Sequence, residues 1–127
     1  MAAPRNTLVF SLNGERIEID NPDPAATLND FLRDHGTTGA KVGCGEGGCG
    51  ACAVLVTILD SHDGHGAVKH ATANSCLRLL CSLDGVAVTT TYGLGSKASG
   101  NRHPLQERID AFNGSQCCFC TPDLVVS

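Results

Sequence analysis

Hydrophobic residues separated by polar ones near the start of the chain predict a β-hairpin. Residues 8–12 and 15–19 are rich in Leu, Val, Phe and Ile, as expected for strands that bury one face. Asn13-Gly14 joins the two segments, and this dipeptide accepts the positive φ values of a tight type I′ turn. We therefore expect two paired strands at the beginning of the fold.

The hydrophobic spacing then changes to that of a helix. Leu28, Phe31 and Leu32 recur at helical intervals, which places them on one face of a helix. Thr27 is suited to cap the start of this helix, and Gly36 is suited to end it. The sequence therefore predicts a short helix that crosses the sheet.

Two further segments predict strands that complete a small sheet. Residues 53–59 and 86–91 are rich in β-branched side chains, which favour strands. Residues 61–69, with their Gly and His side chains, are interpreted as an exposed loop, and the chain turns inward again near Asn74. The predicted fold class of residues 1–91 is α+β, with a mixed sheet packed on one helix.

The last part of the chain predicts a separate helical unit, residues 103–127. Residues 92–102 are rich in Gly, Ser, Asn and Lys, a composition typical of a linker. Pro104 is then suited to begin a helix, and residues 121–123 resemble a second helix start. The apolar face of the first helix consists of Leu105, Ile109 and Phe112. Because this apolar face has no partner in the sequence, we expect the helical unit to be incomplete.

Composition and charge exclude several classes of function. The chain carries a net charge of −4, and its Lys and Arg residues are scattered, unlike the basic patch of a nucleic-acid-binding protein. No apolar run approaches the roughly 18 residues of a membrane span, and no signal peptide is visible. We expect a soluble, cytoplasmic protein without nucleic-acid or membrane partners. In that compartment thiols hold metal or act in redox chemistry more often than they form disulfides.

Four cysteines have the spacing of a plant-type ferredoxin. Cys44, Cys49 and Cys52 form C-x4-C-x2-C, and Cys76 follows after 23 residues, which is the ligand pattern of one [2Fe–2S] cluster. The glycines between them allow backbone N–H groups to approach the sulfurs and offset the negative charge of the cluster. The glycines expected in this role are Gly43, Gly45, Gly47, Gly48 and Gly50.

Zinc and disulfide bonds are the alternatives for these thiols. Zinc commonly takes two widely separated C-x2-C pairs, and this loop holds only one such pair. Disulfides are typical of exported proteins. His62, His65 and His70 could serve as further ligands, but they lie in a polar segment and are interpreted as solvated surface. An iron–sulfur cluster is therefore the favoured interpretation.

A second thiol pair lies in the helical unit. Cys117 and Cys120 form another C-x2-C directly after Gln116. A cluster there needs two more thiols. Cys81 lies in an apolar run and is expected to be buried and inert, and Cys118 is expected to point away from the ligands. The sequence therefore provides only half of a second site.

Three stretches that carry these motifs resemble the N-terminal iron–sulfur region of the molybdenum hydroxylases, the xanthine dehydrogenase and aldehyde oxidase family. They are residues 28–56, 74–85 and 103–122, and they are most similar to the plant aldehyde oxidases. The resemblance implies electron transfer from a molybdopterin centre through two [2Fe–2S] clusters to FAD. The FAD and molybdenum-cofactor domains would be the partners, in an enzyme that is usually homodimeric.

Residue by residue, the resemblance implies two cluster sites. The ligands in a β-grasp ferredoxin-like domain would be Cys44, Cys49, Cys52 and Cys76. An all-α, four-helix domain would bind a second [2Fe–2S] cluster, with Cys117 and Cys120 as its first ligands. Gln116 would lie near the molybdenum cofactor.

The sequence also departs from this family. The other two ligands of the second cluster, a later C-x-C, are absent, and so are the FAD and molybdenum domains. Cys118 and Asp123 stand where family members carry, or usually carry, glycine. We therefore expect a truncated part of a larger oxidase, with one complete [2Fe–2S] site and half of a second. A zinc-stabilised interaction module and a non-functional fragment with a disordered helical half are the alternatives.

Overall fold

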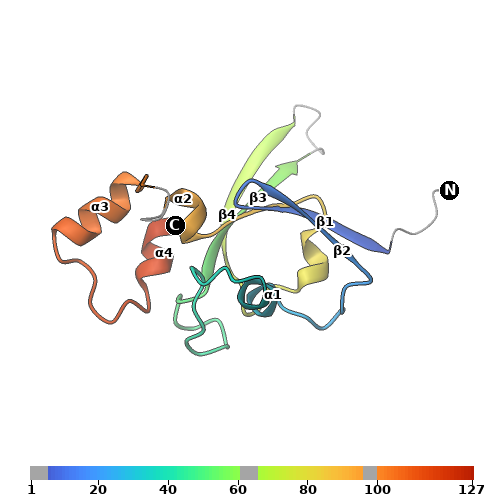
Figure 1. Cartoon of the computed structure of the whole chain (residues 1–127), viewed down its shortest axis with the longest axis horizontal. Helices are drawn as coiled ribbons and strands as arrows, with labels where there is room; N and C mark the ends of the chain where they lie inside the picture. The colour runs from blue at the N-terminus through green and yellow to red at the C-terminus, as the bar shows by residue number, and fades with distance from the viewer. Residues whose placement is uncertain (1–5, 61–65, 96–99) are drawn as a thin grey trace.

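The computed structural model describes residues 6–60, 66–95 and 100–127. Its centre is a five-stranded sheet with the strand order β2-β1-β5-β3-β4 (Figure 1). The strands are β1 (Thr7–Leu12), β2 (Glu15–Asp20), β3 (Ala53–Asp60), β4 (Ala67–Asn74) and β5 (Ala87–Thr89). β1 and β5 are parallel, and all other neighbouring strands are antiparallel. The predicted mixed sheet is therefore confirmed.

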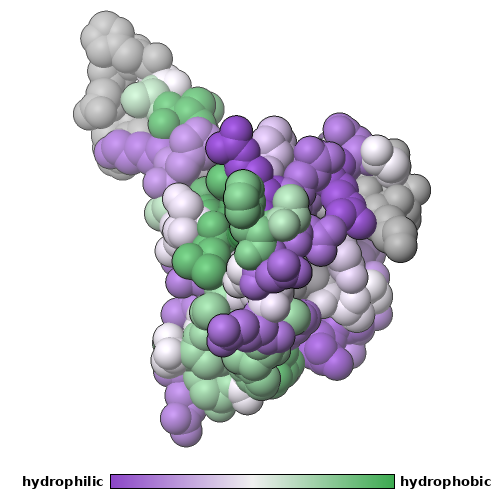
Figure 2. Space-filling view, turned by 90° about the vertical axis from the view of Figure 1, so that its left-hand side faces the viewer, coloured by the Kyte–Doolittle hydropathy of each residue, from purple (hydrophilic) through white to green (hydrophobic). Residues whose placement is uncertain are grey.

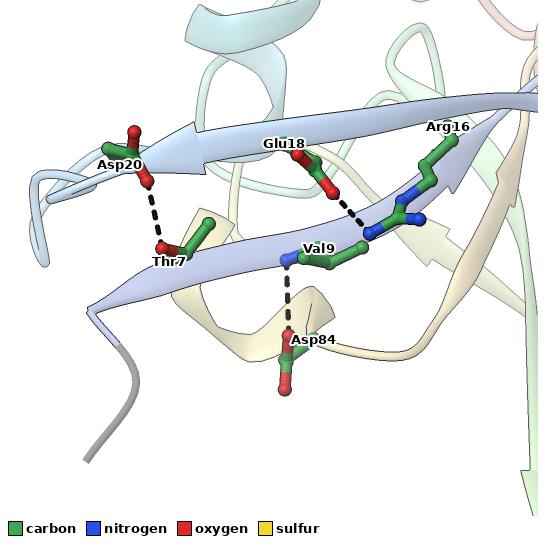
Figure 3. Close-up of polar contacts among 6 residues, drawn as sticks. All are labelled: Thr7, Val9, Arg16, Glu18, Asp20 and Asp84. Carbon is green, nitrogen blue, oxygen red and sulfur yellow. Dashed lines mark hydrogen bonds and ion pairs between the residues drawn. The ribbon is translucent and has the colours of Figure 1, made fainter. Parts of the chain in front are cut away.

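The N-terminal hairpin forms as the sequence predicts. β1 pairs with β2 along the whole length of both strands. Asn13 and Gly14 between them have φ values of +52° and +89°, the left-handed conformation that a tight type I′ turn requires. At the open end of the hairpin, the Thr7 hydroxyl donates a hydrogen bond of 2.8 Å to the Asp20 carboxylate (Figure 3).

The turn before β5 fastens this strand beside β1. The Asp84 carboxylate accepts a hydrogen bond of 3.1 Å from the backbone N–H of Val9 (Figure 3). The N–H of Gly85 donates a hydrogen bond of 2.8 Å to the carbonyl oxygen of Val9. Because Gly85 has a φ of +71°, the chain can reverse there and enter β5 in register with β1. The strand itself is shorter than the predicted segment 86–91.

The prediction of an exposed loop over residues 61–69 is wrong at its C-terminal end, where β4 begins. Residues 67–69 of that loop belong to this strand, which pairs with β3 along its whole length. Its first six side chains are all exposed, so no alternation of buried and exposed positions marks it as a strand. His70 is an exposed residue of β4, with its Nδ1 atom 2.9 Å from the hydroxyl of Thr57. His62 and His65 lie outside the described residues.

Helix α1 (Leu28–Asp34) packs on the sheet and begins at a reciprocal cap. The Thr27 hydroxyl accepts a hydrogen bond from the N–H of Asp30, and the Asp30 carboxylate accepts one from the N–H of Thr27. The helix ends before Gly36, which has a φ of +76°. Both predicted boundaries are thus confirmed.

The hydrophobic core lies between α1 and the sheet and is closed by the 3-10 helix η1 (Leu80–Leu83). Leu28 and Leu32 of the helix are completely buried. Their partners in the core include Leu8, Phe10, Leu12, Val54, Val56, Leu83 and Val88. Burying side chains of this size contributes about 1.5–3 kcal/mol each, which makes this layer the main source of stability.

The C-terminal part of the chain contains three short helices, α2 (Thr91–Leu94), α3 (Pro104–Ala111) and α4 (Thr121–Val126). The expected linker, residues 92–102, overlaps α2, so its first residues are helical. α3 starts at Pro104 as predicted, with His103 and Gln106 forming its capping box. α4 starts at the predicted residue Thr121, although its N-cap position is Cys120 and no side chain caps it.

The exposed apolar face expected for α3 is confirmed for two of its three residues, whereas Ile109 is half-buried. Leu105 is 46% exposed and Phe112 is 82% exposed. Figure 2 views the molecule from the side on which α3 lies and shows hydrophobic residues, in green, at the surface among hydrophilic ones. No helix in the described part of the chain has the length and the apolar composition to span a membrane.

α4, in contrast, is attached to the body of the molecule. Pro122, Val125 and Val126 are buried, and α4 contacts β3 and α2. A side-chain amide from α3 adds a second connection, because Gln106 donates a hydrogen bond of 2.9 Å to the carbonyl oxygen of Thr91. The helical residues are therefore held beside the end of the sheet where β3 begins (Figure 1).

Replacement of Ser75 with alanine should destabilise the fold. The Ser75 hydroxyl accepts a hydrogen bond of 2.8 Å from the Asn29 amide and donates one of 2.8 Å to the carbonyl oxygen of Cys52. Both side chains are buried, so Ser75→Ala leaves the Asn29 amide without its acceptor and should cost about 1–3 kcal/mol. Urea unfolding measures this change. Ser82→Ala is the control, because it removes one solvent-exposed hydrogen bond of 2.6 Å, from the Ser82 hydroxyl to the carbonyl oxygen of Leu79. It should cost less than about 1 kcal/mol, and equal costs in the two variants would contradict the prediction.

Candidate metal centre

The cysteine loop, residues 43–52, leads from α1 into β3. Its base is closed by a hydrogen bond of 2.9 Å from the N–H of Lys41 to the carbonyl oxygen of Ala51. Ala51 and Cys52 are buried, whereas Cys44 is exposed. The loop is therefore anchored at its start and end, and its middle reaches the surface.

Cys44 and Cys49 form the first thiol pair. The N–H of Cys44 donates to the sulfur of Cys49 at 3.4 Å. The N–H groups of Glu46 and Gly48 both donate to the sulfur of Cys44 at 3.3 Å. These backbone hydrogen bonds, that of Glu46 first, lower the pKa of Cys44 from 9.0 to about 7. The loop thus stabilises a thiolate, the form of cysteine that binds metal.

Cys52 and Cys76 form the second thiol pair, with their sulfur atoms 3.3 Å apart. Burial raises the pKa of Cys76, and the hydrogen bond with Cys52 raises it further. The negative charges of Cys52 and Cys44 also raise the pKa of Cys76. Because Cys44 belongs to the first pair, the two pairs lie within electrostatic range of each other.

The arrangement in pairs matches the donor set of a binuclear cluster. A [2Fe–2S] cluster takes four cysteine ligands, two on each iron. The four thiols, the sulfur-directed N–H groups and the small loop residues therefore fit a [2Fe–2S] cluster.

Four of the five predicted glycines are required by the geometry of the loop. A methyl group built on Gly43 would lie 2.5 Å from the sulfur of Cys49. One on Gly47 would lie 2.4 Å from the side chain of Leu77. Gly45, Gly47 and Gly50 have positive φ values, which glycine adopts most easily. At Gly48 there is open space, and the residue contributes through its N–H group alone.

Two residues of this centre were missed by reasoning from the sequence. The Asn74 amide donates a hydrogen bond of 2.9 Å to the carbonyl oxygen of Gly47, and its oxygen lies 3.9 Å from the sulfur of Cys52. Ser75 holds the backbone of Cys52. Both residues directly precede Cys76, and this position is the only signal in the sequence that could have identified them.

The other four cysteines are Cys81, Cys117, Cys118 and Cys120. Cys117 and Cys120 are exposed in the segment between α3 and α4, and no third potential ligand among the described residues joins them. Cys118 has a φ of +64°, and its sulfur lies 3.2 Å from the hydroxyl of Ser115. Gln116 is exposed. Cys81 is exposed as well, which corrects the expectation of a buried thiol.

The sheet, the glycine-lined loop and the paired thiols define a ferredoxin-like iron–sulfur protein. Comparison with known families agrees, because the 2Fe-2S iron-sulfur cluster binding domain matches residues 10–83. The chain therefore belongs to this family, and the predicted ferredoxin-like fold is confirmed.

Curated relatives extend the similarity over nearly the whole chain. The chain is 50% identical over 123 residues to xanthine dehydrogenase of Blastobotrys adeninivorans, which covers 96% of this chain and 8% of that protein. It is 47% identical over 121 residues to abscisic-aldehyde oxidase of Arabidopsis thaliana, covering 94% and 9%. The chain thus spans less than a tenth of the length of these relatives.

Solved structures give the same result. Aldehyde oxidoreductase from Desulfovibrio gigas superposes with a TM-score of 0.76 at 36% identity, covering 95% of this chain and 12% of that chain. Quinoline 2-oxidoreductase from Pseudomonas putida 86 superposes with a TM-score of 0.69 at 30% identity, covering 91% of this chain and 63% of that chain. The resemblance to the xanthine dehydrogenase and aldehyde oxidase family is therefore confirmed.

Alanine substitutions should distinguish glycines of the loop that have no room for a side chain from those that do. Gly43→Ala places a methyl group against the sulfur of Cys49, and we expect a severalfold loss of cluster after anaerobic reconstitution. Gly48→Ala enters open space and should retain the cluster content of the wild type. Iron, sulfide and visible absorption measure the difference. Equal losses in the two variants would contradict the geometry described for the loop.

Proposed function

We propose that this chain is a one-electron carrier with a [2Fe–2S] cluster bound by Cys44, Cys49, Cys52 and Cys76. The observation that supports this proposal most directly is the grouping of these thiols into two pairs. Three of the ligands, Cys44, Cys49 and Cys52, come from the cysteine loop, and the fourth, Cys76, comes from a segment that is remote in the sequence. Such a donor set suits two irons.

Each part of the loop has its own role in this proposal. Cys44 and Cys49 would hold one iron of the cluster, and Cys52 and Cys76 would hold the other. When bound, the cluster accepts and releases one electron at a time. The N–H groups of Glu46 and Gly48 point at the sulfur of Cys44 and offset the negative charge that accumulates there.

We also propose that the chain acts as the electron-transfer portion of a larger oxidoreductase of the xanthine dehydrogenase or aldehyde oxidase type. The names and lengths of its relatives support this proposal. Its partners would be FAD and molybdenum-cofactor domains, in a homodimeric cytoplasmic enzyme. We expect no substrate chemistry from this chain, so the proposed role is electron transfer alone.

The helical unit has a more limited role in this proposal. Cys117 and Cys120 would provide half of the ligands for a second [2Fe–2S] cluster, with Gln116 near the molybdenum cofactor of the complete enzyme. The family resemblance supports this assignment. The left-handed conformation of Cys118 is compatible with it, because glycine, the usual residue at this position in the family, adopts that conformation readily.

Serine substitutions should identify the ligands of the complete site. After anaerobic reconstitution with iron and sulfide, the wild-type chain should contain two irons, absorb visible light and give an EPR signal on reduction. Cys49→Ser should lose these signals, because one iron loses a thiolate. Cys120→Ser should keep them, and so should the control Cys81→Ser, whose thiol is exposed and outside the loop.

Metal analysis of protein isolated from cells tests the same proposal against zinc. Iron and inorganic sulfide in equal amounts are expected. A colourless protein that contains zinc bound by the same cysteines would contradict the electron-carrier proposal and favour a zinc-stabilised interaction module.

A further inference from the structure

The helical unit contacts the cysteine loop at two points. A methyl group built on Gly43 would lie 2.9 Å from the ring of Phe119. One built on Gly50 would lie 3.1 Å from the Cβ atom and 3.4 Å from the carboxylate oxygen Oδ2 of Asp123. Phe119 and Asp123 therefore rest against the loop backbone, one near its start and one near its end.

The position of Asp123 is fixed by the helix that carries it. Asp123 lies in the first turn of α4, between the buried residues Pro122 and Val125, and its carbonyl oxygen accepts a hydrogen bond of 2.9 Å from the N–H of Ser127. The side chain is half-buried. The backbone of Asp123 is thus held in place, and its half-buried side chain lies against Gly50.

The carboxylate also shares a surface hollow with the metal-binding loop. This hollow has a volume of about 390 Å³, and Asp123 borders it together with Gly48, Cys49, Gly50 and Asn74. Gly50 stands between Cys49 of the first thiol pair and Cys52 of the second. A negative charge at Asp123 therefore lies beside the part of the loop that connects the two pairs.

We propose that Asp123 lowers the reduction potential of the [2Fe–2S] cluster bound by the cysteine loop. This inference rests on the proposed function. Reduction by an external one-electron donor adds one electron and one negative charge to the cluster, and no proton is required for charge balance in the step. A fixed carboxylate nearby destabilises the more negative, reduced form more than the oxidised form. Asp123 would act on the cluster through its negative charge and not as a ligand.

A redox titration of the reconstituted full chain tests this role. Dithionite is the reductant, and visible absorption and EPR report the fraction of cluster reduced. Asp123→Asn should raise the midpoint potential, with the equilibrium constant for reduction increasing about tenfold, which is about 59 mV for a one-electron couple. Asp123→Glu keeps the charge and should stay near the wild type. Asp123→Gly removes the charge together with the side chain and should match Asp123→Asn.

Glu15→Gln is the matched control for the loss of one negative charge. Glu15 is exposed at the start of β2, the strand at the opposite edge of the sheet from β4, so its neutralisation should leave the potential unchanged. Asp123 also lies in the first turn of a helix, where an acidic residue is favourable. A purely structural role of that kind would lower the stability of the Asn variant but leave its potential unchanged.

Each outcome decides between the two proposals. Equal potentials in the wild type, Asp123→Asn and Asp123→Gly overturn the role of Asp123 and leave the electron-carrier function intact. If Glu15→Gln shifts the midpoint potential as much as Asp123→Asn, the role of Asp123 is also overturned, because the shift would then depend on the net charge of the chain and not on the position of Asp123. If the wild-type chain binds no iron and sulfide at all, the proposed function fails, and the role of Asp123 fails with it.

Discussion

The pairing of β3 with β4 is the constraint on which the metal centre depends. Two of the four thiols lie on either side of this strand pair, with 23 residues between Cys52 and Cys76. The register Ala53↔Asn74 brings the start of one strand to the end of the other. Ser75 then donates two hydrogen bonds, from its N–H and its hydroxyl, to the carbonyl oxygen of Cys52. The sulfur–sulfur distance of 3.3 Å follows from this backbone geometry.

The first thiol pair depends on a different device, the direction of the backbone N–H groups in the cysteine loop. Cys44 is exposed to solvent. Two backbone N–H groups of the loop donate hydrogen bonds to its sulfur and stabilise the thiolate. Cys76 of the second pair is more buried, and this burial raises its pKa. The two pairs therefore differ electrostatically before any iron is bound, and a cluster held between them would experience an asymmetric environment.

Sequence reasoning identified four thiols with ligand spacing and most of the fold, because the cysteine spacing and the ends of most elements can be read directly from the sequence. The hairpin, α1 and α3 are marked by a turn dipeptide, a capping residue and a proline, each of which acts within a few residues. β4 carries no such signal, since its side chains are almost all exposed and only its pairing with β3 defines it as a strand. Asn74 likewise depends on a partner, Gly47, that lies far away in the sequence.

The helical unit illustrates the same limit at the metal centre. The sequence associates Asp123 with the second thiol pair, because it lies three residues after Cys120. The fold also places its carboxylate against Gly50 of the first site, because the buried residues Val125 and Val126 hold α4 against β3. Packing that stabilises the helix thus also places the Asp123 carboxylate beside the first cysteine loop. The helical unit and the cysteine loop are in contact here even though their cysteines are separate in the sequence.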